Sequence, residues 1–562
     1  MSNASLELGG GNWAAKDGKL LGYAVGDTSG KYLPREFTFS RGADIAATRV
    51  NEDGLVEKYR ENILLQSNQF DTTWSLDASM TLTSGQSGYD GSSDAWLLDK
   101  TAIQFRAVRQ IPVHYNVVTF SVYAKQGTLR YLNYYSPAGD APQIWFDLQA
   151  GAVATKLGTY IEVKMESVGD GWYRCSVTYD AASGDEVRIY PQNLDGSYGS
   201  VAGNIYIQDA QLEQGLVATD YLESGSTTGK AGVLDNLPRI DYTSGSAQLL
   251  MEPSRTNKIE YSEYFNAWTK QSNVTVTDNA TTSPSGFNDA SKYSISASTD
   301  RALDQTTTLT SGVTYTFSMW VKAIVDTTIR VRSDGNDWSE DISLLVSDGW
   351  KRIESTHTMG ITEYEFGFFD ASGSTGDRFY IWGAQLEAGS FATSYIPTYG
   401  AQDTRNFDDV DHFDTSVLGF GTTCSIYFEG IINEASSLYL RPVTMFGSGF
   451  DTSERFLLFG QIFSGGTYTL TSRHNSGGAT NGVDKTGLTV GEKVKCVSVF
   501  DGTSQKFFVN GSSAGTDTVP SAEIFEYLDL SNIAADQNHT IDSLQLYPVA
   551  LSDAECIALT TL

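Results

Sequence analysis

The stretch Thr316-Phe-Ser-Met-Trp-Val-Lys322 and its counterpart Thr119-Phe-Ser-Val-Tyr-Ala-Lys125 decide the fold. In each of them apolar and polar side chains alternate, so that Phe317, Met319 and Val321 share one face of an extended chain. A period of two is typical of a β-strand that packs one face on a core and turns the other outward. Both stretches are therefore predicted to be strands of a sheet with one buried face.

These strands belong to a longer repeat, because three further motifs occur twice in the same order. The pairs are Asn62–Trp74 with Asn257–Trp268, Asp170-Gly-Trp-Tyr-Arg174 with Asp348-Gly-Trp-Lys-Arg352, and Ala210-Gln-Leu-Glu213 with Ala384-Gln-Leu-Glu387. The spacing between motifs drifts, as it does where loops gain and lose residues. The period is too long for a solenoid, so each copy is predicted to be a domain, at residues 61–225 and 255–400 with a linker at 226–254.

The composition agrees with an all-β chain. Of 562 residues, 40% are hydrophobic and only 19% charged, and the 54 Gly and 30 Tyr favour strands and tight turns over helices. Many short strands with Gly-rich turns indicate antiparallel sandwiches, most simply jelly rolls. The prediction is an all-β protein with three antiparallel β-sandwich (jelly-roll) domains in tandem after an N-terminal attachment segment.

The third predicted domain covers residues 405–562. Its strand-like runs are Cys424–Glu429, Arg455–Gly460, Tyr468–Arg473 and Lys493–Phe500. Asn510-Gly511 is a strong hairpin signal. Ser552 and Glu555 have the spacing of a capping box, which predicts a short helix after the final strand.

Residues 1–60 are rich in Gly and have too few apolar residues for a core of their own. They are predicted to be a docking segment that is ordered only when bound to a partner. The alternative is a flexible tail without a partner. No secretory signal precedes them and no run of about 18 apolar residues follows, so we expect synthesis in a cytoplasm and no membrane span.

The net charge and the cysteine content exclude several classes of function and of site. The net charge of −30 repels nucleic acid and anionic membranes. The four cysteines, Cys175, Cys424, Cys496 and Cys556, lack metal-site spacing and are expected to be free core thiols, although a Cys424–Cys496 bridge stays open. No zinc, P-loop or serine-hydrolase motif occurs, so an enzyme is not expected, while a facing carboxylate pair stays open.

Acidic residues suggest a cation site. Asp408, Asp409 and Asp411 follow the second copy closely enough to form a Ca²⁺ loop, but a solvated interdomain linker is the favoured explanation. Glu213 and Glu387 in the closing motifs could face a structural Ca²⁺, but hydrogen bonding to the neighbouring loop is the favoured role. No other cofactor is predicted.

The candidate glycan-binding residues lie at or beside outward strand positions. They are Trp320, Arg330, Trp382, Tyr123 and Arg130. Sugars bind on aromatic faces, with polar side chains nearby for their hydroxyls. Packing of these aromatics under a loop or against a neighbouring domain is the favoured explanation, and glycan binding is the alternative. The second copy is the preferred binder, because it has Trp382 where the first copy has Gln208.

Two resemblances extend this reading. The Asn-x-x-x-x-Ser-x-x-Phe openings, Asp-Gly-Trp turns and Ala-Gln-Leu-Glu closings resemble the carbohydrate-binding-module-like jelly rolls of phage tail and head-fibre proteins. The Trp13–Tyr23 segment resembles the start of such fibre proteins. The ending Leu546-Tyr-Pro-Val-Ala-Leu-Ser-Asp-Ala-Glu555 resembles that of concanavalin A-like (laminin-G-type) lectin sandwiches, which bind glycans or proteins.

These resemblances imply a bacteriophage structural protein, a head or tail fibre or decoration protein in the virion. It would attach to other virion proteins through residues 1–60 and adhere to host-surface polysaccharide. Fibres are commonly trimers, whose symmetric packing covers sandwich edges, so a homo-oligomer is expected. The alternatives are a spacer without a ligand and a polysaccharide-degrading tail enzyme.

Overall fold

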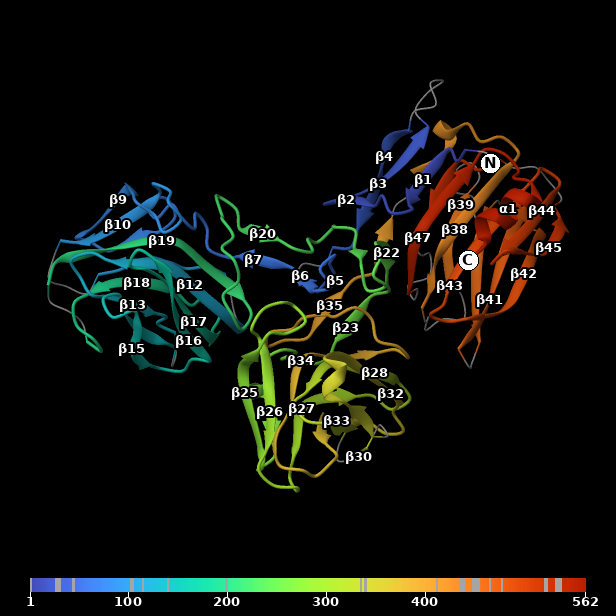
Figure 1. The fold of residues 1–562 in the computed structure, drawn as a ribbon. Coiled ribbons are helices and arrows are strands. Elements are labelled where there is room, and N and C mark those ends of the chain that lie inside the picture. Colours follow the sequence, from blue (N-terminus) through green and yellow to red (C-terminus); the bar gives the residue numbers. More distant parts are fainter. Residues whose placement is uncertain are drawn as a thin grey trace.

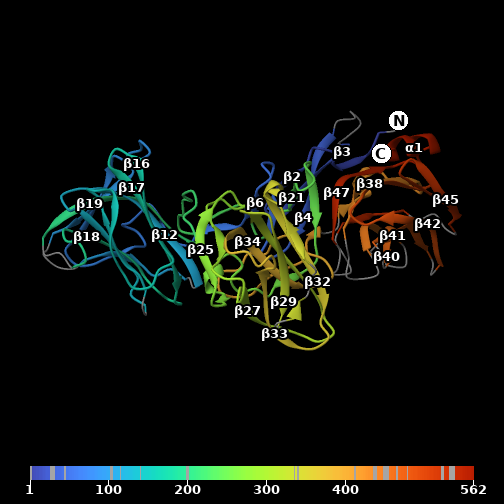
Figure 2. The same cartoon turned by 60° about the horizontal axis from the view of Figure 1, so that its bottom comes forward.

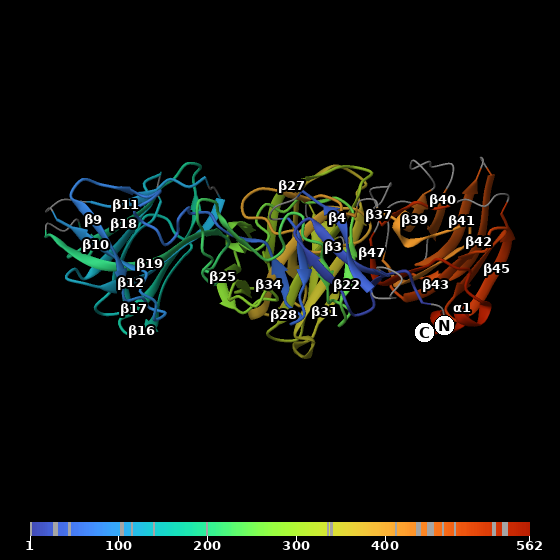
Figure 3. The same ribbon diagram turned by 90° about the horizontal axis from the view of Figure 1, so that it is seen from above.

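A computed structural model describes most of the chain (Figure 1). The described residues are 3–25, 32–42, 46–101, 106–113, 116–138, 141–197, 201–333, 336–337, 341–410, 413–433, 440–446, 455–463, 466–476, 479–519, 524–530 and 538–562. Three β-sandwich units lie in a row, as two further views show (Figures 2 and 3). The chain is therefore nearly all β, as predicted, and among the described residues no helix is long and apolar enough to cross a membrane.

The first sandwich consists of two six-stranded antiparallel sheets. The β12 sheet has the order β16 (Glu162–Gly169), β17 (Trp172–Ala181), β12 (Asn116–Gln126), β19 (Gly203–Gln214), β10 (Ala95–Lys100) and β9 (Met80–Gln86). The facing sheet has the order β15 (Ala152–Leu157), β14 (Gln143–Asp147), β13 (Tyr131–Tyr135), β18 (Val187–Gln192), β11 (Val108–Gln110) and β8 (Ser75–Leu76).

The second sandwich repeats this arrangement. Its β28 sheet has the order β25 (Val274–Thr281), β26 (Ala290–Ile295), β34 (Gly376–Ala388), β28 (Thr314–Ala323) and β32 (Trp350–Thr358). The facing sheet has the order β24 (Thr269–Lys270), β27 (Ala302–Leu309), β33 (Glu363–Asp370), β29 (Thr327–Ser333) and β30 (Asn336–Asp337), and β31 (Ile342–Leu344) also pairs with β29.

The sequence repeat correctly locates an interior strand in each of the two sandwiches. Strands β12 and β28 contain the two alternating stretches, and their predicted apolar faces are buried in the two cores. Phe317, Met319 and Val321 are each at most 1% exposed. Period-two alternation correctly predicts which side chains face the core. It does not predict that the opposite face is covered as well, since Thr316 and Ser318 are 1% and 0% exposed.

The third sandwich is larger, because it includes segments from outside residues 405–562. One sheet follows the path β36 (Asp409–Val410), β4 (Tyr32–Ser40), β3 (Lys19–Val25), β1 (Leu6–Gly9), β47 (His539–Tyr547), β38 (Cys424–Ile432), β43 (Lys493–Phe500), β44 (Ser504–Val509) and β45 (Ser512–Thr518), joined by β2 (Ala14–Lys16), β21 (Ile240–Asp241) and β22 (Gln248–Met251). The other has the order β37 (Phe413–Asp414), β46 (Tyr527–Asp529), β39 (Leu440–Phe446), β40 (Arg455–Phe463), β41 (Thr467–Ser476) and β42 (Ala479–Thr489).

Local signals in this unit are confirmed. The four predicted runs fall within β38, β40, β41 and β43, and Asn510 and Gly511 take positive φ angles of 46° and 77° in the hairpin between β44 and β45. Helix α1 (Asp553–Thr560) has Ser552 as its N-cap with the predicted capping box. All four cysteines are buried and free, so Cys424 and Cys496 form no bridge.

The expectation that residues 1–60 gain order only from an outside partner is wrong. Strand β1 pairs with β47 of the third sandwich, and β3 and β4 extend the same sheet. Leu6, Leu8 and Phe37 are buried in that sandwich's core. The segment is indeed too poor in apolar residues for a core of its own, but it contributes to one made by distant residues. Part of the predicted linker does likewise, since β22 pairs with β47.

Three short ribbons connect the units. They pair β5 (Thr48–Val50) with β6 (Val56–Lys58), β7 (Arg60–Asn62) with β20 (Gly229–Ala231), and β23 (Arg255–Asn257) with β35 (Asp403–Arg405). The first two sandwiches also touch directly, since Val117 N–H donates to the carbonyl of Tyr399 at 3.0 Å and the Asn279 amide donates to Glu162 at 2.5 Å. The β5–β6 ribbon lies over the β28 sheet, which decides how that sheet is exposed.

Candidate functional site

One buried asparagine organises each copy of the repeat. The side-chain nitrogen of Asn62 donates to the carbonyls of Ala210 and Leu222, and its oxygen accepts from the N–H groups of Leu64 and Leu212. In the second copy Asn257 makes the same four bonds, with Ala384, Ile396, Ile259 and Leu386. Each asparagine thus fixes the closing strand and the loop after it against the opening segment.

The closing motif fixes the loop that follows it. Glu387 accepts from the N–H of Thr393 at 2.8 Å and from its hydroxyl at 2.7 Å, and the Gln385 amide donates to Glu387 at 2.6 Å. The same three bonds occur in the first copy, between Glu213, Thr219 and Gln211. The favoured role of both glutamates, hydrogen bonding to the neighbouring loop, is confirmed.

A β-bulge re-aims the side chains at the centre of both outer faces. The register places Trp382 opposite Trp320 and Gln208 opposite Tyr123, and one extra residue follows in the closing strand. Gly383 occupies that place with φ 66°, and Asp209 occupies it in the first copy with φ 53°. Bulges of this kind turn a strand locally and set the direction of a neighbouring side chain.

Aromatic rings cover the outer face of the β28 sheet. The Trp320 ring lies 5.3 Å from that of Trp382 and 5.7 Å from that of Tyr395, measured between ring centroids. Trp382 is completely buried beneath the β5–β6 ribbon, where Lys58 Nζ lies 5.4 Å from its ring. Trp320 is only half-buried, and the Arg352 guanidinium stacks over it at 4.6 Å. Of the two tryptophans, Trp320 is therefore the one that a ligand could reach.

Trp320 lines a groove of about 1010 Å³ between the second sandwich, the β5–β6 ribbon and the third sandwich. Trp350 and Phe391 add aromatic surface, and Arg352, Glu354, Gln248 and Asn538 add polar groups. Trp350, Arg352 and Glu354 alternate along β32, so all three lie on its outward face. The groove combines aromatic surface with hydrogen-bonding groups, which is the composition that sugar rings require.

The corresponding face of the first copy is closed by its own loop. The Tyr89 ring stacks on that of Tyr123 with centroids 3.7 Å apart and planes 4° apart. Gln208 holds this loop, because its amide donates to Asp94 at 2.8 Å and its oxygen accepts from Tyr89 N–H at 3.1 Å. Tyr123 is therefore 9% exposed, and packing under a loop is its role in this structure.

The two predicted arginines do not join the tryptophans. Arg330 lies on β29 and Arg130 lies just before β13, and both strands belong to the facing sheets. Arg130 makes a two-pronged ion pair with Asp147, at 2.9 and 2.6 Å, and Arg330 pairs with Asp341. Adjacency in sequence predicts that these arginines lie beside the aromatic face, but the chain crosses to the facing sheet before each of them.

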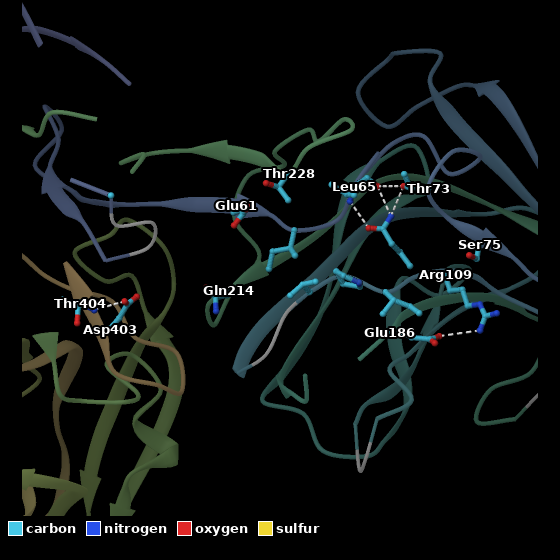
Figure 4. A pocket seen from close by; sticks show the side chains of 16 residues that line it. Glu61, Leu65, Thr73, Ser75, Arg109, Glu186, Gln214, Thr228, Asp403 and Thr404 are labelled. Atoms are coloured by element: carbon cyan, nitrogen blue, oxygen red, sulfur yellow. Dashed lines mark hydrogen bonds and ion pairs between the residues drawn. The ribbon is translucent and has the colours of Figure 1, made fainter. Parts of the chain in front are cut away.

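A second large cavity, of about 1090 Å³, lies between the first sandwich and the β23–β35 ribbon (Figure 4). Among its lining residues, Gln110 bonds to Leu65 and Thr73, and Arg109 lies 3.6 Å from Glu186. Its described lining includes aliphatic side chains such as Ile111 and Val113 but no aromatic ring. It lacks a stacking surface, so the groove at Trp320 is the better candidate for a sugar.

Asp408 belongs neither to a calcium loop nor to a solvated linker. Asp408 is 2% exposed, and its two carboxylate oxygens accept from Arg41, at 3.0 Å, and from Arg239. Two guanidinium groups at the carboxylate oppose a cation there, and burial excludes a solvated linker. Asp409 lies in β36, and Asp411 is outside the described residues. Among the described residues no group of three metal-ligating side chains is present.

Asp408 instead belongs to a buried ion-pair network. Arg239 also contacts Glu252 at 2.6 Å, and Arg405 contacts Glu252 at 3.1 Å. Burial acts to raise the pKa of Glu252, but Arg405 and Arg239 outweigh it and lower that pKa to about 2. The network ties the N-terminal segment, the linker and the segment after the second copy into one junction.

Sequence reasoning missed two residues of this region. Trp350 belongs to the repeated Asp-Gly-Trp turn, and its counterpart Trp172 is 2% exposed, so the motif alone predicts a core residue. The alternation along β32 was the signal that could have found it. Lys58 had no signal, because its partners come from residues more than two hundred positions away.

No known protein family matches the sequence, and no curated protein does. Among solved structures, the CBM40 module of a Ruminococcus gnavus sialidase bound to α2,3-sialyllactose is 18% identical, covering 27% of this chain and 94% of that one with a TM-score of 0.22. The tandem CBM22 domains of Paenibacillus barcinonensis Xyn10C are 14% identical, covering 62% and 98%, with a TM-score of 0.20. Tandem CBM51 modules from Streptococcus pneumoniae are 10% identical, covering 68% and 99%, with a TM-score of 0.15. Likeness this low says nothing about a ligand of this chain.

Proposed function

We propose that this chain is a non-enzymatic, glycan-binding structural protein whose binding site is the groove lined by Trp320 and Trp350. The observation that carries the proposal is the pair of half-buried tryptophans on one outward face, beside Arg352 and Glu354. An indole face packs against the C–H groups of a sugar ring, and charged or amide side chains bond its hydroxyls.

The groove is prepared for binding by its supports. Arg352 donates to Ser318 Oγ and to the carbonyl of Thr393, both at 2.8 Å, which fixes the guanidinium over Trp320. Trp350 Nε1 donates to the carbonyl of Thr282 at 3.1 Å. Side chains held in place before binding lose little conformational freedom when a ligand arrives.

The narrower proposal, a fibre or decoration protein of a bacteriophage particle, rests on the sequence resemblance described above. Many copies on one particle would compensate for a weak single-site affinity by multivalency. The net charge of −30 suits such a role, because it keeps a crowded protein soluble and away from nucleic acid.

Retention on immobilised host-surface polysaccharide tests the groove. Trp350→Ala is expected to weaken binding at least about tenfold, the effect of losing roughly 1.4 kcal/mol of stacking. Tyr89→Ala, which alters the closed face of the first copy, is the matched control and should leave binding unchanged. Equal binding by wild type and a folded Trp350→Ala variant would remove the groove as the site.

A spacer without a ligand is the second candidate, favoured by the burial of Trp382 and by the packed junctions between units. It predicts that the wild-type chain is retained by no glycan on an array and by no host cell surface. A third outcome, release of reducing ends or unsaturated sugars from capsule, would show an enzyme and contradict both candidates.

A further inference from the structure

A lysine and two carboxyl groups meet at the junction between the β5–β6 ribbon and the second sandwich. Lys58 Nζ lies 2.8 and 3.0 Å from the two carboxyl oxygens of Glu263, and 3.6 Å from Oδ2 of Asp289. The three residues come from three separate segments: the end of β6, the opening motif of the second copy, and the residue before β26. The side chains of Glu263 and Asp289 are 1% and 2% exposed, and that of Lys58 is 11% exposed.

Aromatic rings enclose this group. Lys58 Nζ lies 5.4 Å from the Trp382 ring and 5.9 Å from the Tyr399 ring, and the Tyr395 hydroxyl donates to Glu263 at 3.0 Å. Water is therefore largely excluded from around the amine. In such surroundings the charged ammonium–carboxylate pair loses its hydration. Its free-energy advantage over the neutral amine–acid pair is therefore smaller than in water.

The charges do not balance if all three groups are ionised, since one cation faces two carboxylates. Burial, followed by the charge of Asp289, raises the pKa of Glu263, although Lys58 opposes the rise. Burial alone would lower the pKa of the Lys58 ammonium, but Glu263, Tyr399 and Asp289 together raise it above its usual range. A single proton held by Glu263 would make the trio neutral overall.

We propose that Lys58 and Asp289 join in an intramolecular isopeptide bond, with Glu263 as the proton relay. Glu263 relays protons from the Lys58 ammonium to the departing oxygen of Asp289, and the freed amine attacks the Asp289 carboxyl carbon. A C–N bond forms and a C–O bond breaks, releasing one water. The three ammonium hydrogens end as one amide N–H and two in water, and Glu263 returns to its starting state. No oxidant, cofactor or second substrate is required.

The first copy provides an internal comparison. Asp94 precedes Ala95 as Asp289 precedes Ala290, and Asn68 stands where the second copy has Glu263. Asn68 cannot relay a proton, and the Asp94 side chain bonds Gln208 and Ser92, with no lysine among its contacts in the described residues. The same scaffold therefore has the acceptor acid without the nucleophile or the relay. This cross-link should form in the second copy alone.

The cross-link would fasten the β5–β6 ribbon over the second sandwich. It would close a covalent loop that contains the whole first sandwich, because Lys58 precedes that sandwich and Asp289 follows it. Cross-links that close long loops restrict the unfolded chain strongly. Such a loop would also keep Trp382 covered when the protein is under mechanical tension. This inference is independent of glycan binding, because none of the three residues is one of the groove residues on which that proposal rests.

Mass spectrometry of the purified full chain tests the proposal. The intact mass is expected to be about 18 Da below that of the sequence, the mass of one water. Trypsin should no longer cut after Lys58, so residues 50–60 and 271–292 should appear as one branched peptide. The peptide containing Asp94 should be unmodified. A full-sequence mass with free peptides would overturn the bond.

Glu263→Gln separates the relay from simple proximity. It keeps the size and hydrogen-bonding reach of the side chain but cannot take the proton, so the mass deficit should disappear in folded protein. Lys58→Arg should lose the deficit as well, while keeping a cation beside Glu263. A deficit that persists in Glu263→Gln at the wild-type level would overturn the role of Glu263. Neither result depends on a glycan, so the failure of one proposal is distinguishable from the failure of the other.

Discussion

The two copies of the repeat share one scaffold but use different means to cover the same face. In the first copy a loop from the same sandwich lays Tyr89 on Tyr123, and Gln208 fastens it. In the second, a ribbon from outside the sandwich covers Trp382 and leaves Trp320 at a groove. The buried framework is constant, and the outer face is set by whichever segment lies against it. The two copies therefore have one scaffold and differ in how fully the outer face is covered.

The largest test of this comparison concerns the shared framework. Asn62→Ala and Asn257→Ala should each destabilise their own sandwich by about 5 kcal/mol, because each leaves four buried backbone groups without a partner. Hydrogen–deuterium exchange resolved by peptide should show the loss in the mutated sandwich. If one of the two substitutions leaves the stability of its sandwich unchanged, the asparagine does not have the same energetic role in both copies.

The next largest effect is expected at the two covered positions, Trp382 and Gln208, whose substitutions should differ in their cost to stability. Trp382→Ala should cost about 4 kcal/mol through loss of a fully buried ring. Gln208→Ala, at the matching position, should cost about 1–2 kcal/mol through its hydrogen bonds to the loop. Calorimetric transitions of the full chain measure both. Equal costs would mean that the loop of the first copy covers its sheet as firmly as the ribbon covers the second.

The bulge position should give the first copy a pH dependence that the second copy lacks at the matching position. Burial, with the charges of Asp94 and Asp90, raises the pKa of Asp209 to about 7 from an ordinary value near 3.8. The stability from its protonated form is present below about pH 4 and is lost as pH rises through 7. Asp209→Asn should match wild type at pH 4 and exceed it by about 2 kcal/mol at pH 8.

Peptide-resolved exchange across this pH range is the measurement. The second copy has Gly383 at the bulge and serves as the control, since it has no carboxyl to titrate there. An unchanged pH response in Asp209→Asn would mean that another group titrates.

The smallest effect concerns the stacked pair. Tyr89→Ala should cost about 1 kcal/mol, the usual contribution of an aromatic pair beyond its buried area. Hydrogen–deuterium exchange should become faster in the peptide that contains residues 87–94, while exchange in the core strand β12 should not change. Faster exchange throughout β12 would show that the loop supports the sheet as well as covering it.

The features that are best predicted from the sequence are those that depend on residues close together in the chain. Alternation located the buried face of β28, and Ser552 with Glu555 located the final helix, because both depend on residues a few positions apart. The burial of Trp382 under Lys58 and the ion pairs of Asp408 with Arg41 and Arg239 could not be predicted, because their partners lie far away in the sequence. For the same reason Arg330 was placed beside Trp320, although the chain crosses to the other sheet between β28 and β29.

The position of strand β1 determines when, during synthesis, the third sandwich can be completed. Ser5 bonds to the carbonyl of Leu546, 541 residues further along. A ribosome adds about 5–20 residues per second, so β1 is made roughly half a minute to two minutes before β47. During that interval β1 lacks the strand beside which it finally lies, and an unpaired edge is a template for unwanted pairing. The large sheet of the third sandwich is complete only after translation has passed Tyr547. A prematurely terminated chain therefore leaves one edge of β1 unpaired, although β1 still pairs with β3 on the other.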